Sequence, residues 1–377
     1  MDLTARSLRS HLVDELLPLW WEHGRDRGRG GFWNALEMDL SPTGDEFKRL
    51  RVQTRMLYAF SEGVRMGAGS FAREAADRTF GELCESWWHP GGGGWYRTLP
   101  RDGAPRDASA DSYELAFVLL GLAHYLAASG EGEARRAIER TLDLLDARLL
   151  DPGGLGYLSR EGELGVREQN PHLHLLEAFL AVHDATGERT FLERARGVVE
   201  LARWKLIDPE SGTIGERFRA DWTPSDAPIE PGHQFEWAWL LERFERRDPD
   251  ARAGSVERES ARLVHFGERY GVDAVTGGVY AEVDRAGRPL DRTLRLWPQL
   301  ERVHARAAAV RRSPEARPAL RAALETCVGR FRSRAHAGWV EYLEPDEAGR
   351  SRSMRATSVY HIVGALRAAA EALEESP

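Results

Sequence analysis

Polar side chains that can move protons stand at the beginnings of apolar, helix-like segments. The clearest case is IEPGHQFEWAW from Ile229, where His233 and Glu236 open an apolar run. Histidine has an unperturbed pKa of about 6.5, so it can take and return a proton near neutral pH without a cofactor. Further candidates begin other apolar segments: Arg55, Asp111, Tyr113, His174, Glu177, Trp297, Gln299, Glu301, Tyr360 and His361. Recurrence at matching places favours an active site over isolated structural histidines.

The same residue types could bind a metal, but their spacing does not favour it. His172 and His174 are two positions apart, so on a helix they point about 200° apart and cannot ligate one ion. One of them is therefore expected to be structural. His233 and Glu236 could supply two ligands, yet no second cluster with the spacing of a di-metal site accompanies them. We expect no catalytic metal and no cofactor.

The elements that carry these residues repeat along the chain. Six short patterns of small residues followed by aromatic or β-branched residues read as turns or ribbons: GGFWNAL from Gly30, GGGWYRTL from Gly92, GGLGYLSR from Gly153, SGTIGERF from Ser211, GGVYAEVD from Gly277 and AGWVEYLE from Ala337. Their starts are 58 to 66 residues apart. Between them lie pairs of helical segments with apolar residues at i, i+3 and i+4, which gives about twelve helices.

The two helices of each repeat differ in character. The segment after a ribbon is apolar on most faces, as in ADSYELAFVLLGLAHYLA from Ala110, whereas the one before a ribbon has a charged face, as in EARRAIERTLDLLDARLL from Glu133. Enclosed and external helices in equal number predict an all-α fold, an (α/α)6 barrel with short β-ribbons at one end, as one domain over residues 1–377. The enclosed helices would then bring their positive amino-terminal ends, and the candidate residues, to one mouth.

Composition excludes several classes of protein. The chain has 377 residues, 42% hydrophobic and 30% charged, with a formal net charge of -8 and arginines mixed with acids, so we expect no nucleic-acid partner. No apolar signal core or membrane-spanning run is evident, which predicts a cytoplasmic protein without a membrane partner. Cys84 and Cys327 form no metal or disulfide pattern. The oligomeric state stays open, with a homodimer among the options.

Six segments resemble one family closely. They are RVQTRMLYAFS from Arg51, DSYELAFVLLGL from Asp111, NPHLHLLEAFLAVHDATGE from Asn170, PGHQFEWAWLL from Pro231, LWPQLERVHA from Leu296 and ATSVYHIVGAL from Ala356. Together they are similar to the N-acylglucosamine 2-epimerase family, which includes cellobiose 2-epimerases and mannose isomerases on an (α/α)6 barrel. The resemblance runs almost from end to end of the chain.

The resemblance implies roles for individual residues. His233 and His361 match the two acid/base histidines of the family, and Glu236 matches a carboxylate that orients a histidine. Arg55 matches the contact to sugar and enediolate. The remaining candidates are expected to bind substrate: His174, Asp111, Tyr113, Glu177, Trp297, Gln299 and Glu301.

The resemblance also implies a reaction, the interconversion of an aldose and a ketose through a cis-enediolate, with D-mannose and D-fructose as the expected pair. The main alternative is a sugar 2-epimerase. Gln299 stands where acylglucosamine epimerases commonly have histidine, which argues against an N-acetylated substrate, while Arg217 and Arg219 leave a phosphorylated or sulfonated sugar open. Two alternatives from other classes are a glycoside hydrolase that uses paired carboxylates and a non-catalytic sugar-binding protein.

Overall fold

The computed structural model describes residues 1–100, 107–248, 256–344 and 351–374. It divides into two compact units. The N-terminal unit comprises Val13–Val198 and Arg355–Tyr360, and the C-terminal unit comprises Met1–Leu12, Val199–Met354 and His361–Pro377. The expectation of a single domain over the whole chain stays a prediction.

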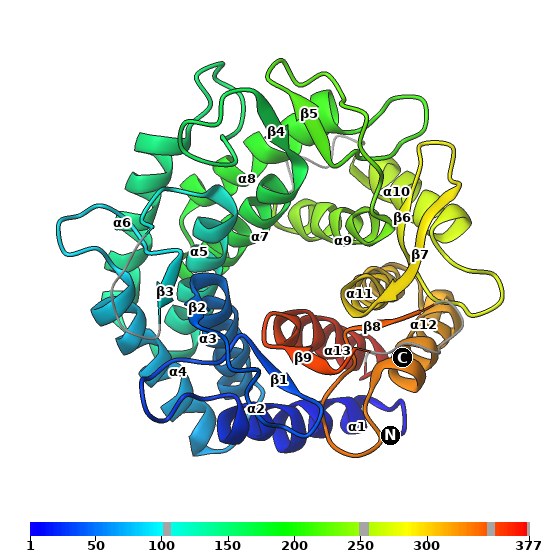
Figure 1. The fold of residues 1–377 in the computed structure, drawn as a ribbon. Helices are drawn as coiled ribbons and strands as arrows, with labels where there is room; N and C mark the ends of the chain where they lie inside the picture. The colour runs from blue at the N-terminus through cyan, green and yellow to red at the C-terminus, as the bar shows by residue number, and fades with distance from the viewer. Residues whose placement is uncertain (101–106, 249–255, 345–350, 375–377) are drawn as a thin grey trace. The chain divides into compact units, whose positions relative to one another are not determined.

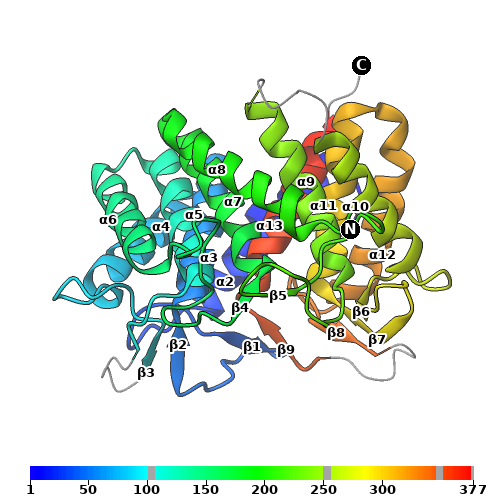
Figure 2. The same cartoon turned by 90° about the horizontal axis from the view of Figure 1, so that it is seen from above.

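The six predicted ribbons are present and share one local geometry. Each contains an antiparallel bridge between residues seven positions apart: Arg25 and Phe32, Trp88 and Trp95, Leu150 and Tyr157, Ile207 and Ile214, Val272 and Val279, and Arg332 and Trp339. Three bridges belong to each unit. Within each unit the ribbons and short strands lie at one end of the helices (Figure 2).

In the N-terminal unit, helices α3, α5 and α7 each follow a ribbon and lie next to one another, with α4 against α3 and α6 against α5 (Figure 1). The helices are α2 (Leu17–His23), α3 (Leu50–Arg65), α4 (Ser70–Glu82), α5 (Ser112–Ser129), α6 (Gly132–Leu149), α7 (Gln169–Thr186) and α8 (Arg189–Leu201), the last of which ends in the C-terminal unit. The strands are β1 (Ala35–Glu37), β2 (Phe47–Arg49), β3 (Thr98–Pro100) and β4 (Val166–Glu168).

In the C-terminal unit, α9 packs against α10 and α11, and α11 packs against α12 (Figure 1). The helices are α1 (Ala5–Ser10), α9 (Pro231–Arg247), α10 (Val256–Tyr270), α11 (Leu296–Arg312), α12 (Arg317–Phe331) and α13 (Ser358–Glu374), whose first turn belongs to the N-terminal unit. Strands β6 (Tyr280–Val283), β7 (Pro289–Arg295) and β8 (Tyr342–Leu343) form an antiparallel sheet. The remaining strands are β5 (Arg217–Arg219) and β9 (Ser353–Arg355).

The described residues contain α1 to α13, one more α-helix than the sequence predicts. The difference arises at the start of the chain, where α1, a π-helical turn over His11–Leu16 and α2 follow one another without a gap. A widened turn of this kind interrupts a single helical stretch without ending it. Two more π-helical turns, Leu83–Trp87 and Ala202–Leu206, extend α4 and α8 toward the next ribbon.

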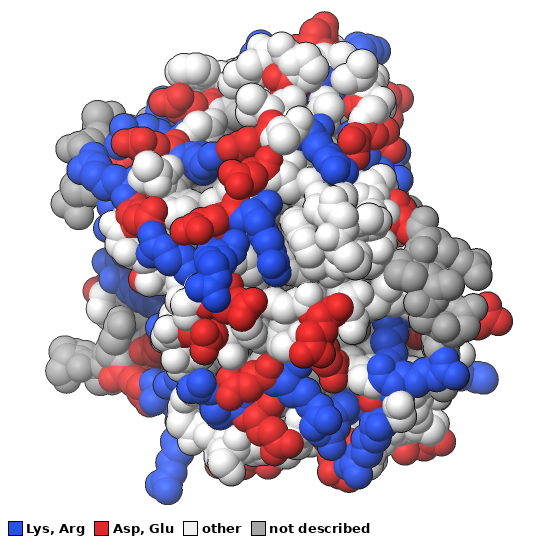
Figure 3. Space-filling view, turned by 90° about the vertical axis from the view of Figure 1, so that its left-hand side faces the viewer, with Lys and Arg blue, Asp and Glu red and all other residues white. Residues whose placement is uncertain are grey.

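The predicted difference between the two kinds of helix is confirmed. Nearly every residue of α5 from Ser112 to Tyr125 is buried, whereas α6 buries one stripe that includes Ala134, Ile138 and Leu145. Among the described residues α5 is also the one helix long and apolar enough to cross a membrane, but 72% of that window is buried inside the protein. Such burial is that of a core helix. The face over α6 shows acidic and basic side chains interspersed (Figure 3).

In four repeats, the helix that follows a ribbon contributes one side chain that hydrogen-bonds the main chain of that ribbon. We call this contact a clamp. Gln53 bonds both the N–H and the C=O of Phe32, at 2.8 and 3.0 Å. Gln234 does the same to Ile214, and Gln299 to Val279. In the third repeat His172 accepts from the N–H of Tyr157 through Nε2. These clamps satisfy buried peptide groups of the ribbon and fix its position on the helix.

Candidate functional site

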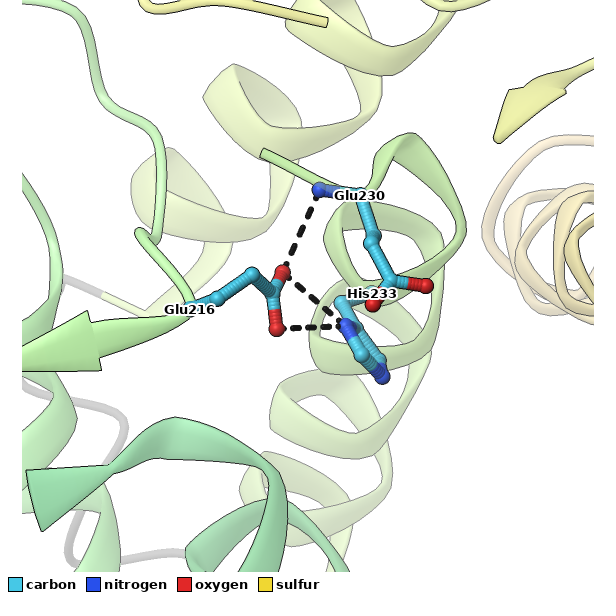
Figure 4. Close-up of side chains that lie close together, drawn as sticks. All are labelled: Glu216, Glu230 and His233. Atoms are coloured by element: carbon cyan, nitrogen blue, oxygen red, sulfur yellow. Dashed lines mark hydrogen bonds and ion pairs between the residues drawn. The ribbon is translucent and has the colours of Figure 1, made fainter. Parts of the chain in front are cut away.

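His233, at the start of α9, lies against the carboxylate of Glu216. The two carboxylate oxygens of Glu216 are 3.0 and 2.9 Å from Nδ1 of His233, and Glu216 also accepts from the N–H of Glu230 at 3.2 Å (Figure 4). Glu216 directly precedes β5, whereas Glu230 is the N-cap residue of α9. An ionised carboxylate only accepts hydrogen bonds, so Nδ1 of His233 carries a proton and Nε2 is the nitrogen that can exchange one.

The charges around His233 raise its pKa. Burial alone would lower the pKa, but the charge and hydrogen bond of Glu216, with the charge of Glu230, outweigh burial and the opposing charge of Arg295. Burial raises the pKa of Glu230, and the neighbouring Glu216 adds to this effect against His233 and Arg295. His233 is therefore suited to donate a proton near neutral pH.

The second histidine of the C-terminal unit, His361 on α13, has a carboxylate of its own. Its Nδ1 is 2.6 Å from Glu301 on α11, and Glu301 also accepts from Nε1 of Trp239 at 2.7 Å. Trp297 lies against both histidine rings, with centroid distances of 4.8 Å to His233 and 5.9 Å to His361. The C-terminal unit thus places two carboxylate-held imidazoles around one half-buried indole.

In the N-terminal unit, the guanidinium of Arg55 on α3 is held on several sides. It donates to the C=O of Thr357 at 3.0 Å and to the hydroxyl of Tyr113 at 2.8 Å, and it stacks over the Phe117 ring at 3.9 Å. Arg55 is buried, and its Nε has no hydrogen-bond partner among the described residues. A fixed, buried guanidinium is suited to binding a developing negative charge.

A second group in the N-terminal unit joins His174 and Glu177 of α7 to Tyr360. The Tyr360 hydroxyl donates to Glu177, and Nδ1 of His174 is 3.5 Å from the same carboxylate. His174 also lies edge-on to Tyr113, with centroids 5.2 Å apart. His174, Glu177 and Tyr360 are buried, whereas Tyr113 is half-buried. The group therefore continues the surroundings of Arg55 through Tyr113.

Two of the expected substrate-binding residues have structural partners. Asp111 caps α5 by accepting from the N–H of Glu114, and its carboxylate pairs with Arg97 and Arg160. Gln299 uses its amide to clamp Val279 and also donates to the C=O of Arg295. We therefore leave Gln299 and Asp111 out of the proposed chemistry. Trp237 and Trp239 are core residues, whereas Trp297 is half-buried.

The sequence-based choice of carboxylates is incomplete. Glu236 was expected to orient a histidine. A carboxylate oxygen of Glu236, a carboxylate oxygen of Glu301 and a ring nitrogen of His361 all lie within 4.8 Å of one another. Glu301 was expected to bind substrate, yet it holds His361. The sequence analysis did not identify Glu216 and Glu230, because it searched for polar residues inside the first turns of helices and both residues lie before α9 begins. The only signal was the position of Glu216 in the fourth ribbon motif, SGTIGERF.

Among the described residues, two groups bring together atoms that could hold a metal ion: Glu216 with Glu230 and His233, and Glu236 with Glu301 and His361. In both groups Nδ1 of the histidine is already at hydrogen-bond distance from a carboxylate oxygen. Such a bond is the arrangement of an acid/base pair, in which the carboxylate fixes the tautomer and orientation of the imidazole. His172, by contrast, is the structural member of the His172/His174 pair, as expected.

Comparison with known proteins agrees with this description. Residues 30–365 match the family described as N-acylglucosamine 2-epimerase (GlcNAc 2-epimerase). A mannose-6-phosphate isomerase of Rhizobium meliloti is 35% identical over 312 residues, covering 79% of this chain and 78% of that protein. A cellobiose 2-epimerase of Bacteroides fragilis is 24% identical over 319 residues, covering 80% and 81%. The crystal structure of a D-mannose isomerase superposes with a TM-score of 0.89 at 22% identity, over 97% of each chain.

The fold and the matched relatives define an enzyme of the (α/α)6-barrel class, a sugar isomerase or epimerase. The chain belongs to the N-acylglucosamine 2-epimerase family. The predicted fold class, family and enzyme class are thereby confirmed.

Proposed function

We propose that this protein is a cofactor-independent aldose–ketose isomerase that interconverts D-mannose and D-fructose. The observation that carries the proposal is the pair of buried histidines, His233 and His361, each held through Nδ1 by its own carboxylate and both lying against Trp297. Two oriented imidazoles supply an acid and a base without a metal.

The reaction begins with opening of the sugar ring. Protonated His233 donates to the ring oxygen as the bond between C1 and that oxygen breaks, and the C1 hydroxyl passes its proton to solvent water as the aldehyde forms. His361 then removes the proton from C2, which leaves a cis-enediolate with its charge on oxygen. Delivery of that proton to C1, with transfer of a proton from the C2 oxygen to the C1 oxygen, yields the ketose.

Other residues support this chemistry in the proposal. Arg55 binds the charge that develops on the enediolate oxygens, since its guanidinium is already fixed by Tyr113 and Thr357. His174 and Glu177 bind sugar hydroxyls, and Tyr113 positions Arg55. Glu301 and Glu236 support His361, while Trp297 offers an apolar face to the sugar.

Two neighbouring reactions remain as second candidates. Return of the proton to C2 from the opposite face, with His233 as second base, would give a 2-epimerase, the activity named for the cellobiose 2-epimerase relative. A phosphorylated substrate is supported by the name of the mannose-6-phosphate isomerase relative. A glycoside hydrolase is disfavoured, because Glu216, Glu301 and Glu177 are engaged with His233, His361 and Tyr360.

Proton NMR in D2O tests the proposal. The purified protein is incubated separately with D-mannose, D-mannose 6-phosphate and cellobiose, with and without EDTA. Deuterium-labelled fructose from mannose, unaffected by EDTA, is the expected result. Fructose 6-phosphate alone would change the substrate class, an epimeric aldose would change the reaction, and no exchange with any of the three sugars would contradict the proposal.

Variants at the two histidines test their roles. His361→Asn should lower kcat for mannose by about 10²- to 10⁴-fold, because the base that removes the C2 proton is lost. His233→Asn should lower turnover of the ring-closed sugar similarly. A matched control is His265→Asn on α10, a helix that precedes a ribbon, and it should leave kcat unchanged. Near-normal turnover in either active-site variant would exclude that histidine.

We also infer that the protein works in the cytoplasm as a sugar-metabolising enzyme. The support is its two cysteines, Cys84 and Cys327, both of which are free thiols.

A further inference from the structure

We propose that Glu216 is a positioning residue that keeps His233 in its proton-donating form, and that Glu230 and Arg295 adjust this state in opposite directions. The inference deepens the proposed function and rests on it for its catalytic meaning. None of these three residues contacts a reacting atom in the proposal; each acts through His233.

The geometry of Glu216 is that of a fixed partner. Its carboxylate spans the gap from the fourth ribbon to the start of α9, where it meets Nδ1 of His233 and the N–H of Glu230 (Figure 4). Two directions of hydrogen bonding restrict rotation of the carboxylate. The imidazole is thereby held in one orientation, with Nε2 as its exchangeable nitrogen.

The ribbon has an anchor besides Glu216. The ribbon is already anchored two residues earlier, where Gln234 bonds the N–H and the C=O of Ile214 at 2.9 Å each. Ile214 also bridges to Ile207. The Glu216 side chain, by contrast, meets Nδ1 of His233 and the N–H of Glu230.

The charged groups near His233 come from several elements. Glu216 precedes β5, Glu230 caps α9, and Arg295 ends β7 with Nη1 3.5 Å from Glu230 and its guanidinium over Trp297 at 5.6 Å. The charge of Glu282 on β6 raises the pKa of Glu230. Beyond Trp297 lie His361 and Glu301. The two carboxylates nearest His233 favour its charged form, whereas Arg295 disfavours it.

This arrangement predicts shifts of opposite sign. Replacing Glu216 by Gln removes the charge that stabilises the imidazolium, so the pKa of His233 should fall. Glu230→Gln should lower it less, because Glu230 has no hydrogen bond to the ring in this structure. Arg295→Gln should raise it. A residue with a purely structural role would not shift the pKa in a direction set by its charge.

The primary test is a histidine ¹⁵N NMR titration of the whole protein. His233 is assigned by the signal lost in His233→Asn, and its titration is followed in each variant. Glu216→Asp should restore most of the wild-type midpoint. Glu210→Gln is the matched control, since Glu210 is an exposed acid of the same ribbon region, and it should leave the midpoint unchanged.

The pH profile of kcat gives a second reading. Turnover falls at high pH because the acid form of His233 is lost. Glu216→Gln should therefore move the alkaline limb of the kcat profile to lower pH. At a pH above that limb, kcat should fall about tenfold for each pH unit by which the limb moves. The titration does not need a substrate, so failure of the proposed reaction and failure of this inference are distinguishable.

An unchanged His233 midpoint in Glu216→Gln, or shifts of the same sign in Glu216→Gln and Arg295→Gln, would overturn the proposal. If Glu216→Gln does not fold, as judged by circular dichroism, the opposed shifts of Glu230→Gln and Arg295→Gln decide it.

Discussion

The contacts of Arg55 hold its guanidinium in one position. Its guanidinium donates to the C=O of Thr357 and to Tyr113 while lying flat over Phe117. These contacts use the planar fork of arginine, which the point charge of lysine cannot reproduce. The residue thus contributes both charge and a fixed direction of its donors.

We expect Arg55→Lys to lower kcat/KM for the sugar substrate by about 10²- to 10³-fold, the loss typical of removing one donor to a developing oxyanion. Most of the loss should appear in kcat, because the charge on the enediolate exists only after C2 deprotonation. Steady-state kinetics measures the division. Tyr113→Phe removes one hydrogen bond to Arg55 and should lower kcat/KM less than Arg55→Lys does. An equal loss of kcat/KM in both variants would contradict the expectation that the planar guanidinium of Arg55 is needed.

At this scale the sequence singles out the two histidines that lie against carboxylates, but it does not identify their partners. His233 and His361 were found because they begin apolar helical segments. Glu216 lies 17 positions before His233, on a ribbon whose path cannot be read from periodicity. Gln299 was expected to bind substrate because of its place between Trp297 and Glu301. In the structure its amide bonds the main chain of Val279.

The clamps are the feature that unites the repeats at the scale of elements. Gln53, Gln234 and Gln299 perform the same task, and His172 performs it in the third repeat. The ring of His172 accepts from Tyr157 through Nε2, and its Nδ1 lies 2.8 Å from the C=O of Glu168, to which it donates. Protonation of Nε2 would abolish the first bond.

The third clamp is consequently sensitive to acid. Burial lowers the pKa of His172 to about 4. The unfolded chain binds a proton at a higher pH than the native protein does, so this residue makes stability fall as the pH drops from about 6.5 toward 4. The cost approaches about 3 kcal/mol at the acid end of this window.

We expect His172→Gln to preserve the clamp, as glutamine does in three other repeats, and to remove this acid sensitivity. Urea unfolding of both proteins at several pH values measures it: the free energy of unfolding of the variant relative to wild type should rise by about 3 kcal/mol between neutral pH and pH 4. Parallel pH curves for the two proteins would show that His172 does not titrate in this way.

The sequence predicts the helices well because their apolar periodicity extends over four or five turns. It cannot predict the π-helical turns at His11–Leu16, Leu83–Trp87 and Ala202–Leu206. No local propensity distinguishes such turns from an α-helix.

At the scale of the whole molecule, contacts between distant segments close the C-terminal unit. Nε1 of Trp339 donates to Nε2 of His11 at 3.0 Å across 328 positions, and Arg9 pairs with Glu374. Trp339 and His11 are both buried. The first residues of the chain therefore contribute to the core of the unit that contains His233 and His361.

We expect His11→Ala to reduce the free energy of unfolding by about 1 to 3 kcal/mol, because the buried indole N–H of Trp339 loses its acceptor. Chemical denaturation measures the change. In a Trp339→Phe background the same substitution should cost less, since the donor is already absent. Equal costs in the two backgrounds would mean that the hydrogen bond adds nothing.

The clamps have one more consequence. They bind the main-chain N–H of a ribbon residue and, in three repeats, also its C=O. These hydrogen bonds therefore place no demand on the side chain of that residue. It is Phe32, Tyr157, Ile214 or Val279 in the four repeats. A duplicated unit held in this way can lose sequence similarity to its copies while retaining their geometry.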